Sequence, residues 1–104
     1  MHKFEHLPDY WSRDEELLNS VPDNLPVEVE DIVYRKNLSF MEDDPIWDIV
    51  VVIPDSSDLK MSDWALLHKF RNKLMDIIFP RDWDRFPMVS FKSISEAKKE
   101  YGFS

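Results

Sequence analysis

The sequence predicts an α+β fold in two layers, a short mixed three-stranded sheet with helices in the order α-β-β-α-β-α. An apolar, β-branched run at residues 47–53 is typical of a central strand. The segment from Ser62 to Pro80 repeats apolar residues at helical spacing. A chain of 104 residues with 43% apolar side chains can fill one core. We therefore expect residues 1–104 to form a single domain, and the sequence leaves open whether residues 1–10 are ordered or flexible.

The first predicted element is a short helix over residues 13–20. Ser12 and Glu15 match a capping box, in which the serine hydroxyl accepts from the Glu15 N–H and the Glu15 carboxylate accepts from the Ser12 N–H. Pro22 and Pro26 then bracket an extended linker, because the residue before a proline is disfavoured in the helical conformation. The helix should therefore end before Pro22.

Two strands follow, separated by a polar segment. Residues 27–34 alternate as a half-buried strand does, but the phase of the alternation changes midway, which predicts a β-bulge near Glu30 and Asp31. Residues 35–45 form a connection too long for a tight hairpin turn. We expect residues 27–34 and 47–53 to pair antiparallel, with the second strand at the centre of the sheet.

The second half of the chain predicts a helix, a strand and a helix. Pro80 ends the long helix, and a short strand at residues 88–91 should lie parallel to a neighbour after a right-handed crossover. Ser93 and Glu96 form a second capping box, and Gly102 stands where a helix-ending glycine belongs. The apolar stripe of the long helix comprises Trp64, Leu67, Phe70, Leu74, Ile77 and Ile78, and its outer face carries Lys69, Arg71 and Lys73.

Charge is unevenly distributed along the chain. The formal net charge is −8, with 15 acidic and 4 basic side chains in residues 1–58 but 6 acidic and 9 basic in residues 59–104. Phosphate backbones and anionic membrane surfaces repel such a chain, so nucleic-acid binding is disfavoured. A basic protein is the favoured partner.

Composition also excludes several kinds of chemistry. The chain has no cysteine, which removes disulfides, thiolate metal sites and cysteine nucleophiles and favours a cytoplasmic location. Its single glycine, Gly102, is too few for a phosphate-cradling nucleotide loop. The longest apolar run is far shorter than a membrane span. We therefore expect no cofactor and no membrane insertion.

The candidate binding residues combine carboxylates with aromatic rings. The acidic loop before the central strand is either a solvated connection or a docking surface, since it adjoins a tryptophan. The aromatic residues of the loop at residues 80–87 either close the core or contribute to an interface, where such residues are enriched. The predicted partner-binding residues are Glu42, Asp43, Asp44, Trp47, Trp83 and Phe86.

Carboxylates flanking the central strand raise the alternative of metal chemistry. Asp48 begins the strand and Asp55 follows its end, and in this the stretch is similar to nucleotidyltransferases, which hold a divalent cation with carboxylates projecting from a strand. The chain lacks the upstream Gly-Ser turn of those enzymes, and Val50 stands where their second acid belongs. Asp55 fits a turn or cap role better. The alternative is a divalent-metal-dependent enzyme using Asp48, Glu42 and Asp44, or a degenerate nucleotidyltransferase-like protein.

The leading hypothesis from the sequence is a small acidic interaction module rather than an enzyme. Such a module would bind and neutralise or regulate a basic protein, as immunity proteins, antitoxins and inhibitors do. Its mechanism would be electrostatic steering followed by anchoring through aromatic side chains. A further alternative is a structural subunit that assembles into a homo-oligomer through its sheet edge.

Overall fold

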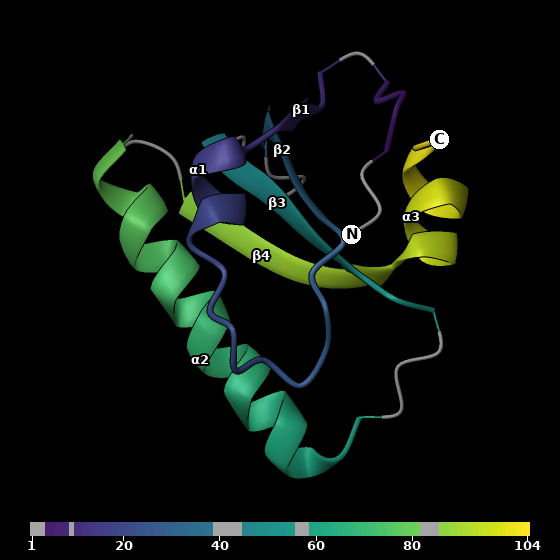
Figure 1. Ribbon diagram of the computed structural model, residues 1–104. Helices are drawn as coiled ribbons and strands as arrows, with labels where there is room; N and C mark the ends of the chain where they lie inside the picture. Colours follow the sequence, from purple (N-terminus) through teal and green to yellow (C-terminus); the bar gives the residue numbers. More distant parts are fainter. Residues whose placement is uncertain (1–3, 9, 39–44, 56–58, 82–85) are drawn as a thin grey trace.

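The computed structural model describes residues 4–8, 10–38, 45–55, 59–81 and 86–104. Three α-helices pack around one four-stranded sheet in this part of the chain (Figure 1). The elements in chain order are β1 (Ser12–Arg13), α1 (Glu15–Asn19), β2 (Asp31–Leu38), β3 (Pro45–Ile53), α2 (Met61–Ile78), the 3₁₀ helix η1 (Phe79–Arg81), β4 (Phe86–Ser93) and α3 (Ile94–Tyr101).

The sheet has the strand order β1-β2-β3-β4. β1 pairs antiparallel with β2 and β2 pairs antiparallel with β3, while β3 and β4 are parallel and are joined through α2. The α+β class, the antiparallel pairing of the two predicted strands and the parallel crossover are thereby confirmed. The prediction of three strands in the order α-β-β-α-β-α is wrong, because a fourth strand, β1, precedes the first helix.

The start of α1 explains this error. Ser12 belongs to β1, where it is aligned with Tyr34 of β2, so it does not cap a helix. The cap is Asp14, whose Oδ1 accepts from the Leu17 N–H at 3.0 Å. α1 therefore has only five residues and begins at Glu15. A carboxylate cap and the backbone pairing of β1 together replace the predicted capping box.

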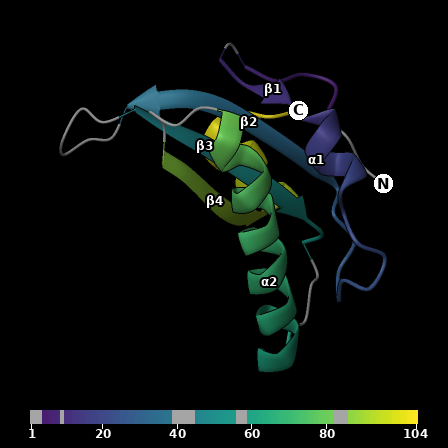
Figure 2. The same ribbon diagram turned by 90° about the vertical axis from the view of Figure 1, so that its left-hand side faces the viewer.

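Both faces of the sheet are covered, so the predicted two-layer arrangement is also wrong. β3 alternates between two cores, because successive side chains of a strand point to opposite faces. α1 and α2 cover one face, and α3 with the two terminal segments covers the other (Figure 2). The core on the α2 face contains Leu17, Ile32, Trp47, Ile49, Val51, Phe70, Leu74 and Ile78, and the core on the α3 face contains Phe4, Trp11, Val33, Val50, Val52, Ala97 and Phe103.

The beginning of β2 shows the predicted irregularity. The Glu30 N–H donates to the Val52 carbonyl at 2.8 Å, while Asp31 is aligned with the same Val52. Val29 and Ile32, three residues apart, both reach the core on the α2 face. Glu30 and Asp31 therefore both lie opposite the single residue Val52 of β3, which is the arrangement of a β-bulge.

The long helix α2 buries Leu67, Phe70, Leu74 and Ile78, as its apolar spacing predicts. Trp64 is 41% exposed, so its predicted place in the core is wrong. The N-terminal half of α2, which carries Trp64, extends beyond the sheet in Figure 1 and so has fewer residues to pack against than the C-terminal half has. Within the described ranges, no helix is both long and apolar enough to cross a membrane.

The C-terminal helix α3 follows the sequence closely. The Ser93 hydroxyl accepts from the Glu96 N–H at 3.2 Å, and the Glu96 carboxylate accepts from the Ser93 N–H at 3.1 Å. Gly102 ends the helix with φ +76°, a left-handed conformation that favours glycine. The chain end then pairs with the N-terminal segment, since the N–H groups of His6 and Ser104 donate to each other's carbonyls.

Candidate functional site

The predicted partner-binding residues divide into three groups. Glu42, Asp43, Asp44 and Trp83 lie outside the described residues. Trp47 is only 8% exposed and packs against Tyr34, with the ring centroids 5.2 Å apart. Phe86 is 60% exposed at the start of β4 and aligned with Ile46 of β3. Their role in partner binding remains a prediction, and Phe86 is the described member with the most accessible ring.

Part of the acidic charge is internal. Asp31 is fully buried and accepts from Arg13 through both oxygens, from Nε and from Nη2, each at 2.8 Å. Its oxygens also accept from the backbone N–H groups of Phe4 and Ile32. The hydrogen bond to Asp31 raises the pKa of Arg13 above its ordinary value. This carboxylate fixes β1 and the N-terminal segment against β2 and offers nothing to an outside partner.

Asp48, the candidate metal ligand, is paired with the positively charged side chain of Arg35. Its Oδ2 accepts from Nε of Arg35 at 3.1 Å, and the Arg35 guanidinium lies 4.4 Å from the centre of the Trp11 ring. Burial and then the negative charge of Asp48 raise the pKa of Tyr101 beside this pair. In the described part of the chain, no group of three His, Asp or Glu side chains could hold a metal ion.

Asp55 lies in the turn that follows β3, as its position predicts, and it also supports the start of α3. It accepts hydrogen bonds from both the N–H and the hydroxyl of Ser95, in the first turn of α3. These bonds lower the pKa of Asp55 below its ordinary 3.8. The carboxylate therefore stabilises the start of α3 and links it to the end of β3.

An acidic hollow lies between α1 and β2, in the segment that the sequence predicts as a plain extended linker. It has a volume of about 350 Å³, and one stretch of chain, residues 21–29, forms it. Six of its eight lining residues have apolar side chains, while the carboxylate-bearing residues Asp23 and Glu28 lie at exposed positions on it. The full lining is Val21, Pro22, Asp23, Leu25, Pro26, Val27, Glu28 and Val29.

Such a hollow suits one kind of side chain. Lys and Arg carry an apolar stem beneath a charged head, so their stems can lie on apolar walls while the head meets carboxylates. A charged hydrogen bond between such a head and a carboxylate is about twice as strong as a neutral one. Sequence reasoning missed this hollow, although the signal was present: two prolines and two acids interleaved with apolar residues.

A second cavity, of about 230 Å³, lies at the outer edge of β4. Residues 86–89 of β4 line it together with Arg71 and Met75 of α2. Arg71 was predicted on the solvent-facing side of the helix, but its Nε is buried. The exposed neighbour Met88, like Phe86, adds an apolar surface to this edge.

Comparison of the chain with protein-family models, with curated proteins and with solved structures found no match. The function is therefore inferred from the geometry and charge of the chain itself.

Proposed function

We propose that this chain is a small acidic interaction module that binds a basic protein and thereby neutralises or regulates it, in the manner of immunity proteins, antitoxins and inhibitors. The observation that carries the proposal is the acidic hollow of residues 21–29. It combines six residues with apolar side chains and the exposed residues Asp23 and Glu28 around a volume of about 350 Å³. A Lys or Arg side chain of the partner is the natural occupant.

The charge of the whole chain supports the same proposal. A net charge of −8 on 104 residues attracts a basic protein from a distance and speeds its encounter. Two further exposed acids, Glu15 and Glu16, belong to α1, the helix that precedes this segment in the chain. Because this attraction is screened over about 8 Å at physiological ionic strength, association should slow as salt is raised.

Rigidity of the hollow also supports a binding role. Leu25, Val27 and Val29 pack on the core beneath α2, so the segment is held on one side by buried contacts. Two prolines fix the backbone dihedral φ at Pro22 and Pro26. A preformed surface loses less conformational entropy on binding than a flexible one does.

The test is affinity capture with matched variants. The wild-type protein is immobilised and offered the proteins of its host, including the products of neighbouring genes, at low salt. We expect recovery of a basic protein whose binding weakens with salt and is lost in the double variant Asp23→Asn/Glu28→Gln. The control Glu5→Gln/Asp76→Asn removes the same charge at exposed positions away from the hollow and should retain the partner.

Two results would overturn the proposal. One is that no basic protein is recovered even at low salt. The other is a partner that both double variants lose equally, since net charge alone, and not the hollow, would then account for its binding.

A further inference from the structure

The cavity at the outer edge of β4 differs in chemistry from the acidic hollow. β4 is the end strand of the described sheet and pairs with β3 on one side. An edge strand presents backbone N–H and C=O groups that another strand can pair with. β4 has eight residues, whereas β1 at the opposite edge has two, so β4 is the longer edge available to a partner.

Arg71 places an unused hydrogen-bond donor beside this edge. Its Nε is buried and has no acceptor among the residues that the structure describes. Trp47, aligned with Pro87 on the neighbouring strand, likewise keeps a buried indole N–H without an acceptor in the described ranges. Buried donors in proteins are nearly always paired, so an unpaired donor marks a place where an acceptor fits. Trp47 belongs to the core, whereas Arg71 lines the cavity, so only Arg71 can meet an acceptor from outside.

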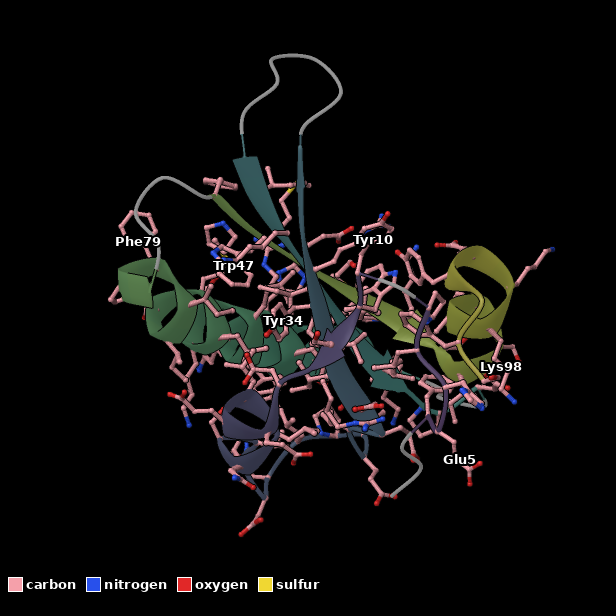
Figure 3. All side chains as sticks on the ribbon, turned by 90° about the horizontal axis from the view of Figure 1, so that it is seen from above. Glu5, Tyr10, Tyr34, Trp47, Phe79 and Lys98 are labelled. Atoms are coloured by element: carbon pink, nitrogen blue, oxygen red, sulfur yellow. The ribbon has the colours of Figure 1, made fainter. Side chains whose placement is uncertain are left out.

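Apolar side chains surround the same edge. Phe86 is 60% exposed and Met88 is 52% exposed on β4, and Phe79 is 46% exposed where α2 ends. Figure 3 shows Phe79 and Trp47 toward the same end of α2. Phe86 and Met88 alternate with the core-facing Val89 and so lie on the face of β4 away from α2, whereas Phe79 lies on the α2 side. Exposed apolar side chains therefore flank both faces of this edge, and such side chains are typical of interaction surfaces.

We propose that this edge binds an extended segment of a partner protein, which adds to the sheet beside β4 and directs an Asp or Glu side chain to Arg71. Strand addition uses the backbone for affinity and side-chain pockets for specificity. A carboxylate is the acceptor that matches a guanidinium best. The edge thus selects a β-forming, acidic segment.

A second copy of this chain fits the edge less well. If β4 paired with β4 of another molecule, the residues brought to Arg71 would come from Phe86–Ser93, which contains no acidic residue and one lysine. Arg71 would keep its donor unpaired in such a dimer. The charge of Arg71 therefore favours a different protein.

The proposal shares with the proposed function only the premise that the chain binds proteins. The segment of residues 21–29, which lines the hollow, and β4 lie on opposite sides of α2 (Figure 2). The test begins by selecting peptides as long as β4 from a random displayed library on the wild-type protein. The best binder is synthesised together with a copy in which its acid is replaced by the amide. Binding is followed by NMR, through the backbone amides and the Nε–H signal of Arg71.

The expected result has three parts. Selected peptides carry alternating β-branched residues and one acid. Their binding shifts the amides of residues 86–93 and the Arg71 Nε–H signal, and the amide copy binds about tenfold more weakly, as loss of one charged hydrogen bond predicts. The variant Arg71→Gln weakens binding by the same factor, whereas Lys69→Gln, the same charge change on the opposite flank of α2, does not.

Several outcomes would overturn the proposal. Peptides that shift residues outside β4, or an amide copy that binds as tightly as the acid, would do so without any protein variant. Sedimentation showing a wild-type dimer whose interface is β4 would assign the edge to a second copy instead. A failure confined to these peptides leaves the capture experiment with Asp23 and Glu28 unaffected, so the two proposals can fail separately.

Discussion

Arg13 supplies the cation that pairs with the buried carboxylate of Asp31, so replacing it is expected to destabilise the fold. Its guanidinium makes two hydrogen bonds of 2.8 Å to Asp31, which is fully buried, while the Arg13 side chain is 23% exposed. The substitution Arg13→Met keeps the apolar stem but leaves a buried carboxylate without its cation. Removing one partner of a buried ion pair typically costs about 3–5 kcal/mol.

The surroundings of Asp31 place the expected cost at the lower end of that range. The N–H groups of Phe4 and Ile32 still donate to the carboxylate at 3.2 and 2.9 Å, so part of its charge remains compensated. We expect a loss of about 3 kcal/mol, and at about 4 °C per kcal/mol the Tm should fall by roughly 12 °C. Urea unfolding followed by tryptophan fluorescence and far-UV circular dichroism measures the change.

A double variant separates the ion pair from general damage. Arg13→Met/Asp31→Asn removes both charges and should be more stable than Arg13→Met alone, because no buried charge is left unpaired. The reasoning is refuted if Arg13→Met costs less than about 1 kcal/mol, the value of an exposed pair. It is also refuted if the double variant is no more stable than the single one.

Three further predictions concern α3. Ser93→Ala removes the cap hydroxyl and should lower the free energy of unfolding by about 1 kcal/mol in urea titrations. An unchanged free energy of unfolding would contradict the capping role. Gly102→Ala should cost about 1–2 kcal/mol because of its φ of +76°, as the added Cβ meets only Pro8 at 3.7 Å; a neutral result would show that the backbone relaxes. The pKa of Asp55 is lowered by bonds from Ser95, so its contribution is present above the unfolded pKa and is lost as pH falls below about 4. The protection factors of α3 amides, which are corrected for the intrinsic exchange rate at each pH, should therefore fall with acid in the wild type and depend less on pH in Asp55→Asn. Equal pH dependence in the two proteins would refute this role.

Local sequence signals predicted those elements whose stabilising contacts are near in sequence. The strand around residues 47–53 is apolar on both faces because both faces are covered, and its composition alone indicates this. Ser93 and Glu96 form their capping box within one turn of helix. Gly102 has the left-handed φ that its position suggests.

The errors arose where distant contacts decide the outcome. Ser12 and Glu15 match the capping pattern as well as Ser93 and Glu96 do, but Ser12 pairs with β2 and Asp14 takes the cap. The strand β1 has two residues and depends on Arg13 meeting an acid 18 positions away, which no local window contains.

The candidate sites were also set by tertiary structure. The acidic hollow exists because residues 21–29 fold back on the core. The two prolines predict an extended linker, and such a prediction does not indicate contacts between the linker and the core. Arg71 has a buried Nε because α2 lies beside the edge of β4, although helical spacing placed it with the outer lysines. Phe86, predicted from its aromatic and charged surroundings, is exposed at that same edge.

The most direct measurement of the central claim is an NMR titration of the wild-type protein with N-acetylarginine amide, compared with its neutral citrulline counterpart. If the hollow receives a basic side chain of the partner, arginine should shift the amides of residues 21–29, citrulline should not, and Asp23→Asn/Glu28→Gln should abolish the shifts while Glu5→Gln/Asp76→Asn preserves them. Arginine shifts spread over all exposed acids, or the same shifts with citrulline, would contradict the account.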